Sequence, residues 1–439
     1  MATANLAPVE FRGVDAAPLP APEIGAPPEA AARDAVRIPH IAIDVFCESP
    51  EVMDAVERAA ADRMMARAHV ALHHGGLAAA LALYANAATP NLILIESRSS
   101  AAAFLQELDA LSQVCDLGTK VMAIGYTNDI SLYRELMQRG VSEYLLAPVD
   151  PLSLIRAISS IYGEAAAEKL GRTIAFVGAK GGVGSSTLAH NVGWMIARNS
   201  GSHVIMADLD LPFGTGSLDF NIDAGMGVAD AIEDPGRLDD VLLDRLIVKH
   251  DEHLSLLRAP VSLDRCYDLD PAAIAPLIAV AQESAPFLIL DMPHLWTSWA
   301  RNAVVAADDI IITAIPDLAN LRNAKAMLVH LRQARPNDPP PKVVLNQVGT
   351  PKRPEISPKE FAKALQQEPL ACIPFEAHAF GTAANKGQML PEVAAKSAAV
   401  RMIGGLADAL AARTDAKAVT KRKFGFRSLV GRLRRDSRG

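Results

Sequence analysis

Residues 173–197 read TIAFVGAKGGVGSSTLAHNVGWMIA, and this stretch decides the fold of the second half of the chain. The apolar run 173–177 has the composition of a buried strand, and the residues after Ser185 have that of a helix. The glycines of the intervening turn let backbone N–H groups close around phosphate oxygens, and the helix start adds partial positive charge. The stretch therefore predicts a strand, a phosphate-binding loop and a helix, in that order.

Similar apolar runs recur on both sides of this stretch and alternate with amphipathic, helix-like segments. This alternation predicts parallel sheets with helices on both faces, and so an α/β protein with two doubly wound domains, at 37–164 and 172–412. The first domain is expected to have strands within 38–46, 91–97, 120–126 and 142–151 and helices at 51–68, 130–140 and 152–163. The second is expected to have about seven core strands, within 173–177, 203–208, 254–260, 287–293, 309–316, 342–348 and 371–375.

Composition excludes several classes of protein. With 439 residues, half of them apolar, the chain can bury real cores. Its four cysteines lie far apart without metal-ligand spacing, which argues against a disulfide framework or a structural metal and favours the cytoplasm. No apolar run reaches the roughly 18 residues of a membrane span. His73 and His74 lie in an Ala-rich stretch read as helical, where packing or exposure is a simpler role than metal binding.

The two ends of the chain differ in composition from the rest. Residues 1–36 contain eleven Ala and six Pro, which predicts a disordered leader. Residues 417–439 hold nine Lys or Arg and one acid, so the remainder has 34 basic and 49 acidic side chains. Such a split is typical of an interaction tail, here taken as 413–439.

The tail can form a short basic amphipathic helix. Its apolar side would consist of Phe426, Leu429, Val430 and Leu433, and its basic side of Arg427, Arg434, Arg435 and Arg438. Such helices adsorb to anionic lipid, which predicts docking to the inner-membrane surface or to a partner. A solvated basic tail or a nucleic-acid contact is the alternative reading.

The glycine-rich loop resembles that of the deviant phosphate-loop ATPases of the ParA and MinD family, whose usual form is KGGVGK followed by two hydroxyl residues. The resemblance implies ATP and Mg²⁺ as ligands. It implies that Ser186 ligates Mg²⁺ and that Lys180 reaches across a dimer to the partner's nucleotide. The nucleotide-binding residues in the loop would be Lys180, Gly181, Gly182, Val183, Gly184, Ser185, Ser186 and Thr187.

Three acids and an amide later in the chain extend this resemblance. Asp210 would orient or activate the attacking water and, with Asp291 and Ser186, lie at the metal. Asp208 would line the same site, and Asn346 would read the adenine. Each acid taken alone could instead be a strand-end helix cap, but the order and spacing of all three after the loop favour the functional reading.

Ser185 is the departure from the family pattern. A lysine normally stands there and offsets charge on the β- and γ-phosphates. Serine supplies no charge, so binding can persist through the backbone while hydrolysis is expected to be slow or absent. We therefore expect ATP-dependent dimerisation through Lys180, with at most weak ATPase activity.

The first domain resembles a response-regulator receiver domain that has lost its chemistry. Glu96 stands at the phosphoacceptor position, and Ala147, followed by Pro148, stands at the lysine position. Asp44 and Glu48 do not form an adjacent acidic pair. Phosphoryl transfer needs a nucleophilic carboxylate, a metal and a charge-neutralising lysine, so a pseudo-receiver is expected. Glu96 could imitate the phosphorylated state; the simpler expectation is a solvent-exposed strand-end acid.

A receiver-like module ahead of GAKGGVGSST and DLDLPFGTGSLDF closely resembles the CpaE/TadZ family of pilus assembly proteins. The resemblance implies an ATP-binding localisation factor for the Flp-type (tight adherence) pilus machinery. This factor would recruit pilus components to a cell pole and lie in the cytoplasm or at the inner membrane. One alternative is an active partitioning or positioning ATPase that acts on DNA or membrane; the acidic body disfavours the DNA version. The other is a phosphorylation-controlled regulator, which Glu96 and Ala147 disfavour. An iron protein of the superfamily would need two cluster-ligating cysteines per subunit at matched positions, and it is disfavoured because Cys266 stands alone in the middle of this domain.

Overall fold

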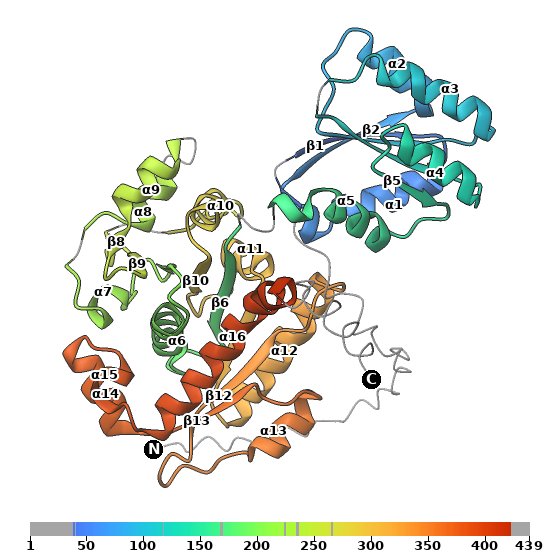
Figure 1. Ribbon diagram of the computed structural model, residues 1–439. Coiled ribbons are helices and arrows are strands. Elements are labelled where there is room, and N and C mark those ends of the chain that lie inside the picture. The colour runs from blue at the N-terminus through green and yellow to red at the C-terminus, as the bar shows by residue number, and fades with distance from the viewer. Residues whose placement is uncertain are drawn as a thin grey trace, which may run out of the picture.

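The computed structural model describes residues 38–39, 41–116, 118–166, 170–223, 225–233, 237–264 and 267–422. These residues form two α/β domains, each built on its own sheet, and Figure 1 shows the smaller one, blue to green, beside the larger. The predicted fold class is confirmed. The predicted leader, all of it within 1–37, and most of the predicted tail lie outside the described residues.

The smaller domain is a parallel five-stranded sheet in the order β2-β1-β3-β4-β5. This is the strand order of flavodoxin-like proteins. Helices α1 and α5 pack on one face and α2, α3 and α4 on the other. Its strands are β1 (Ile41–Cys47), β2 (Ala68–His74), β3 (Leu92–Glu96), β4 (Lys120–Gly125) and β5 (Glu143–Leu146), and its helices are α1 (Pro50–Ala60), the 3₁₀ helix η1 (Arg63–Met65), α2 (Gly76–Tyr84), α3 (Ala101–Ser112), α4 (Ile130–Gln138) and α5 (Pro151–Ala166).

The predicted helix at 51–68 is wrong in its second half. Helix α1 ends at Ala60, because the side chain of Asp62 accepts the backbone N–H of Met64 at 2.9 Å and starts η1 instead. The chain then enters strand β2, which contains His73 and His74, so the helical reading of those histidines is also wrong. The ring of His73 stacks on Phe46 at 4.8 Å between centroids, which is a packing role.

The larger domain is an eight-stranded sheet in the order β13-β12-β11-β6-β10-β7-β9-β8. All neighbours are parallel except β8 and β9, so a short antiparallel edge strand adds to the seven predicted. The strands are β6 (Arg172–Gly178), β7 (Val204–Asp208), β8 (Val248–Lys249), β9 (Leu254–Leu257), β10 (Phe287–Asp291), β11 (Asp309–Ala314), β12 (Lys342–Val348) and β13 (Ala371–Pro374). The helices are α6 (Ser185–Ser200), α7 (Gly216–Asp219), α8 (Val228–Glu233), α9 (Asp240–Leu246), α10 (Ala275–Ser284), α11 (Ser298–Ala306), α12 (Leu318–Ala334), α13 (Pro358–Leu365), α14 (Ala377–Lys386), α15 (Leu390–Ala394) and α16 (Ala398–Arg422).

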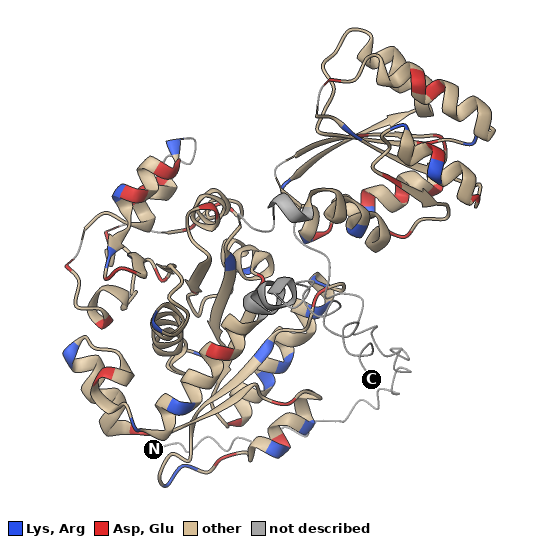
Figure 2. Ribbon diagram, viewed as in Figure 1, with Lys and Arg blue, Asp and Glu red and all other residues tan. Residues whose placement is uncertain are grey.

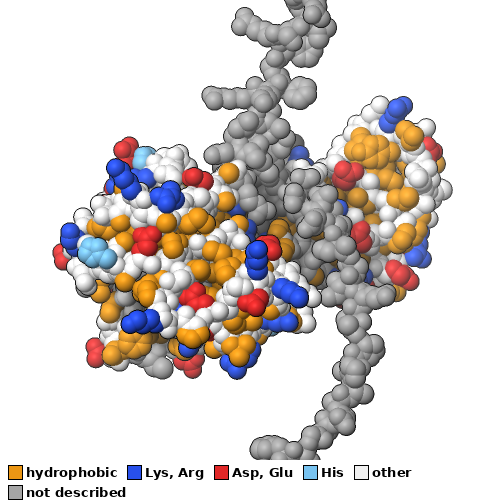
Figure 3. All heavy atoms as spheres, turned by 90° about the horizontal axis from the view of Figure 1, so that it is seen from below, with side chains coloured by type: hydrophobic (Ala, Val, Ile, Leu, Met, Phe, Trp, Pro, Cys, Tyr) orange, Lys and Arg blue, Asp and Glu red, His pale blue; other side chains and the backbone are white. Residues whose placement is uncertain are grey.

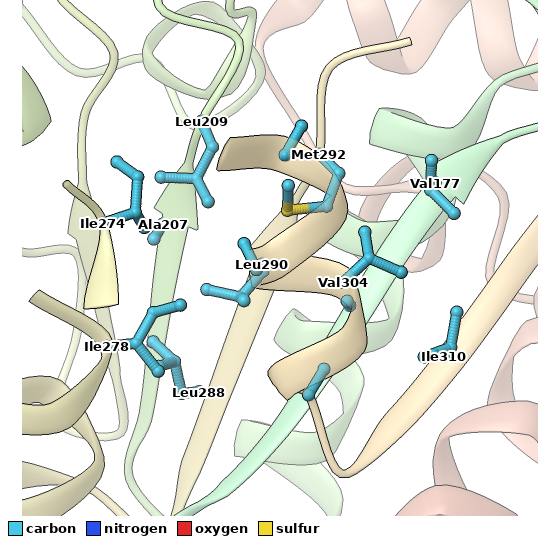
Figure 4. Packing of buried hydrophobic residues seen from close by; sticks show 14 of the residues in the cluster. Val177, Ala207, Leu209, Ile274, Ile278, Leu288, Leu290, Met292, Val304 and Ile310 are labelled. Atoms are coloured by element: carbon cyan, nitrogen blue, oxygen red, sulfur yellow. The ribbon is translucent and has the colours of Figure 1, made fainter. Parts of the chain in front are cut away.

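The central strands of the larger sheet are buried on both faces, which is why they read as continuous apolar runs. Along β6, Ala175 and Val177 face the layer that contains α10, α11 and α12, and Ile174 and Phe176 face the layer that contains α6 and α16. Figure 4 shows part of the first layer, where Leu288 and Leu290 of β10 lie close to Ile278 of α10. Burying each such side chain contributes about 2 kcal/mol, and together they hold the strand ends that carry the site.

The two domains meet through buried charges. The guanidinium of Arg63 in η1 donates to both carboxylate oxygens of Asp338, at 2.7 and 2.8 Å, and lies 3.5 Å from Asp308. Arg335, at the end of α12, donates to the same Asp338 carboxylate at 2.8 Å. Burial would raise the pKa of Asp338, but Arg63 and Arg335 hold it below its ordinary value. Two further contacts, Asn337 to Asp62 at 2.9 Å and Arg67 to Gln282 at 2.7 Å, flank this pair.

Within the described residues no helix is long and apolar enough to cross a membrane.

Candidate functional site

The glycine-rich loop connects the carboxyl end of β6 to the first residue of α6. Gly184 caps the helix with φ +83°, and Gly182 has φ +76°, so both adopt the left-handed conformation that favours glycine. Backbone N–H groups at this helix start have no partner within the helix, which suits them to phosphate oxygens. The predicted strand, loop and helix are thus all present in the expected order.

Side-chain amides hold the loop in place. Asn346 at the end of β12 donates to the carbonyl oxygen of Val183 at 2.8 Å, and Asn323 of α12 donates to that of Ala179 at 2.9 Å. Gln347 donates to Gly182 at 3.2 Å. Asn346 therefore lies at the loop, with its side-chain amide nitrogen engaged there; its role in reading adenine stays a prediction.

Ser185, which stands where related loops usually have a lysine, is half-buried. Its hydroxyl oxygen is buried and has no hydrogen-bond partner among the described residues. A buried hydroxyl without a partner is costly, and a phosphate oxygen at this position would satisfy it. Lys180 is exposed at the opposite end of the loop, where it contributes to lowering the pKa of Asp317, the residue that caps α12.

Two of the predicted acids lie side by side at the carboxyl edge of the sheet. Asp208 ends β7, Asp291 ends β10, and the two residues are direct neighbours in the parallel register. The Asp208 carboxylate accepts N–H groups from Gly216 at 2.9 Å and Asp210 at 3.2 Å. Burial and the neighbouring charge of Asp291 raise the pKa of Asp208 to about 7. The edge thus concentrates negative charge beside the phosphate loop.

Asp291 and Asp210 have different surroundings. Asp291 is buried, and neither of its carboxylate oxygens has a hydrogen-bond partner among the described residues. Asp210 follows β7 and is partly exposed, and burial raises its pKa as well. Together with the Ser186 hydroxyl at the start of α6, these oxygens are the kind of donors that Mg²⁺ takes. The residues present therefore fit a magnesium nucleotide, and the individual roles assigned from the sequence stay predictions.

His190 is a site residue that the sequence reasoning missed. It lies on α6 one turn after Ser186 and is fully buried, with Nδ1 2.7 Å from Asp219 of α7 and Nε2 3.3 Å from Asp291. Burial would lower the pKa of His190, but the two carboxylates raise it to about 10. The available signal was its spacing of four residues from Ser186, which places both on one face of the helix.

In the smaller domain, Glu96 ends β3 and is fully buried, so the expectation of a solvent-exposed acid is wrong. One oxygen accepts the N–H groups of Glu48 and Ser49, at 2.7 and 2.8 Å, and the other accepts the hydroxyls of Ser49 and Tyr126, at 2.5 and 2.7 Å. Burial would raise the pKa of Glu96, but these donors lower it below its ordinary value. The only basic group near it in the described residues is Arg98, 3.7 Å away, since Ala147 replaces a lysine.

We expect Glu96→Gln to reduce the free energy of unfolding by about 2 kcal/mol at pH 7, because an amide NH₂ would face hydroxyl and N–H donors. The pKa of Glu96 is lowered on folding, so its contribution is complete above about pH 4.5 and is lost as the pH falls through the folded value. Urea unfolding at pH 7 and at pH 3 checks both points, with the exposed Glu57→Gln as the control. An equal loss at both pH values would contradict the assignment.

Comparison with known proteins found a matching family model and several similar proteins. A family model described as an AAA domain matches residues 171–338. The septum site-determining protein MinD of Synechocystis is 27% identical over 160 residues, which is 36% of this chain and 59% of that protein. The chain thus matches less than two thirds of the length of this curated relative.

Two solved structures are also similar to this chain. A pilus assembly protein CpaE from Caulobacter crescentus is 52% identical and covers 29% of this chain and 97% of its own, with a TM-score of 0.29. A ParA family ATPase from Chlorobium tepidum is 25% identical and covers 54% of this chain and 98% of its own, with a TM-score of 0.50. The CpaE chain is similar to this chain in sequence, and the ParA family ATPase is similar in fold as well.

Proposed function

We infer that this chain, which belongs to the CpaE family of pilus assembly proteins, is an ATP-binding assembly factor of a pilus machine. Membership rests on the 52% identity across 97% of the Caulobacter crescentus chain. The larger domain is of the ParA/MinD ATPase type, as its matches and its loop indicate. The rest of the proposal concerns what this domain does with a nucleotide.

The observation that carries the proposal is the loop itself. Left-handed Gly182 and Gly184 expose backbone N–H groups at the start of a 16-residue helix, and the buried Ser185 hydroxyl has no partner among the described residues. These groups would hold the phosphates of ATP, while Ser186 and Asp291 would hold Mg²⁺, directly or through water. The bound ion would neutralise phosphate charge, because Ser185 stands at the position where a lysine would usually do so.

Hydrolysis in this proposal is weak. Asp210 would orient a water, and its place after β7 and its partial exposure support that role. Ser185 gives no positive charge to the transition state, and the loss of such a group commonly costs orders of magnitude in rate. ATP would then act mainly as a ligand whose binding switches assembly, rather than as a source of energy through hydrolysis.

The switched state would be a dimer of two copies of this chain. Figure 3 shows hydrophobic side chains gathered over the face of the larger domain that is seen from below. The segments that follow the strands carry exposed large apolar residues, among them Phe213, Leu295, Trp296, Leu218 of α7 and Leu318 at the start of α12. A second copy packed over these exposed residues would cover them and bring its Lys180 to the first copy's nucleotide.

We expect Mg-ATP to double the mass of the wild-type protein in light scattering, and Lys180→Ala to stay monomeric. The reason is that the exposed Lys180 would supply charge to the partner's nucleotide. Lys249→Ala, another exposed lysine on the edge strand β8, serves as the control and should dimerise normally. If the mass ignores ATP in all three proteins, the nucleotide switch is refuted.

Recruitment of pilus components to a cell pole, at a Flp-type machine, is the cellular part of the proposal. Contact with the inner membrane through residues 413–439 would support it, and deleting residues 421–439 and measuring liposome co-sedimentation tests that contact. A partitioning ATPase acting on DNA is less favoured, because acidic and basic residues alternate along the described ribbon (Figure 2) and the body is acidic overall. A fluorescent fusion spread evenly in cells would contradict the polar role.

A further inference from the structure

The cluster of His190, Asp208 and Asp291 contains more than a magnesium nucleotide site requires. One ligand atom from each residue lies within 4.8 Å of the others, and all three side chains are at most 3% exposed. Two of these groups are left without hydrogen-bond partners in the described residues, namely Nε2 of His190 and both carboxylate oxygens of Asp291. Buried polar atoms are usually paired, so unpaired atoms that converge on one point indicate a ligand between them.

The orientation of the His190 ring supports the same conclusion. Its Nδ1 is fixed by the Asp219 carboxylate at 2.7 Å, so Nε2 is the nitrogen turned toward Asp291. Histidines that ligate metals nearly always give their other ring nitrogen to a carboxylate or carbonyl, which sets the ring and raises its basicity. Asp219 has that position here, and it comes from a separate element, the short helix α7.

The distance between the two facing ligand atoms also fits a metal. Nε2 of His190 and Oδ2 of Asp291 are 3.3 Å apart. Two ligands bound at about 2.1 Å to one tetrahedral ion lie about 3.4 Å apart. Without a metal, the same two atoms would form an ion pair between a protonated ring and the carboxylate, and a metal ion would take the place of that proton.

The charges around His190 also favour a bound cation. Three carboxylates, those of Asp208, Asp219 and Asp291, surround one imidazole, and of these groups only Asp219 is partly exposed. Even a protonated ring leaves an excess of negative charge, and a divalent ion that takes the place of the Nε2 proton reduces it further, while the proton leaves to bulk water. Buried charge of one sign is costly unless it is paired or coordinates a metal.

We propose that His190, Asp208 and Asp291 bind a divalent transition-metal ion directly, without the help of a nucleotide. An imidazole nitrogen suits Zn²⁺, Co²⁺ or Fe²⁺, whereas Mg²⁺ takes oxygen ligands only and would be held by Ser186 and the nucleotide, with Asp291 reaching it through water. Asp219 acts as a positioning residue through the ring of His190. The ion ties α6, β7 and β10 together behind the phosphate loop.

The experiment is a Co²⁺ titration of the full-length, chelator-treated protein at pH 8 without nucleotide, followed by visible absorption. One equivalent per chain should bind and give the bands of a nitrogen- and oxygen-coordinated ion, and a large excess of Mg²⁺ should not displace it. His190→Asn keeps a donor for Asp219 but removes Nε2, and it should weaken Co²⁺ binding at least tenfold. The exposed His250→Asn is the matched control and should bind as the wild type does.

A second variant tests the proposal in case His190→Asn does not fold. Asp219→Asn changes only the group that orients the ring, and it should weaken Co²⁺ binding between about tenfold and a hundredfold. The proposal is overturned if the wild type gives no Co²⁺ bands, if Mg²⁺ displaces the ion at equal concentration, or if folded His190→Asn binds as tightly as the wild type. Because ATP is left out, none of these results depends on whether the nucleotide proposal is correct.

Discussion

Replacing Gly184 by valine is expected to weaken ATP binding by on the order of a hundredfold. Gly184 has φ +83°, and a Cβ there would lie 2.5 Å from Nδ2 of Asn346. A branched side chain in the left-handed conformation costs about 1–2 kcal/mol, and losing the bond from Asn346 to Val183 costs about 1–3 kcal/mol. Since each 1.4 kcal/mol is tenfold in affinity, the two effects together give the expected loss if they distort the loop.

Calorimetric titration with Mg-ATP measures this effect. Gly201→Val is the control, because Gly201 also has a positive φ, +62°, at the other end of α6, but a Cβ there meets nothing within 4 Å. Gly182→Ala separates the two causes, since Gly182 shares the strain but has no neighbour to displace. Unchanged ATP affinity in folded Gly184→Val would show that phosphates do not bind at this loop.

Replacing Arg63 by alanine is the second substitution that we expect to have a large effect, here on the free energy of unfolding. Arg63 and Asp338 are 12% and 9% exposed, and the alanine variant would leave the Asp338 and Asp308 carboxylates at the domain contact with less compensation. Breaking a buried ion pair in this way costs about 3 kcal/mol, and the first unfolding transition in urea should move to lower concentration by a corresponding amount.

Arg58→Ala is the matched control for Arg63→Ala. Arg58 pairs with Asp54 on the surface of α1, with both side chains more than 60% exposed, so its loss should change stability by less than about 0.5 kcal/mol. Equal effects in the two variants would mean that the domains do not rely on the Arg63 contact. Little salt dependence is expected for the Arg63 pair, because buried charges are weakly screened.

Much of the fold could be predicted because its signals are local. The loop at 179–184 lies between a strand and a helix that are adjacent in the chain, and apolar runs such as 287–291 are long enough to be recognised alone. Strand β2 was missed because AHVALHH is short, half-buried and follows an Ala-rich helix, so its alternation was hidden. The helix before it was drawn too long, because the capping by Asp62 competes with helix propensity in a way that sequence alone does not decide.

The site was harder to predict where its parts come from distant positions. Asp208 and Asp291 end neighbouring strands, and the order of motifs brought them together. The contact of His190 with Asp219 and Asp291 depends on how α6, α7 and β10 pack, and no short pattern carries that information. The burial of Glu96 likewise depends on Tyr126, which lies 30 residues away on another strand end.

The contact at Asp338 affects how this chain can be cut and recombined. Helix α12 begins beside the phosphate loop, where Asn323 donates to Ala179, and ends at Arg335, which shares Asp338 with Arg63 of the other domain. A fragment that starts at residue 170 would keep Arg335 but lose Arg63, and a chimaera with a foreign first domain would lose the same pair unless it supplied an arginine at that place. A change on one side of this contact is therefore expected to need a compensating change in the other domain.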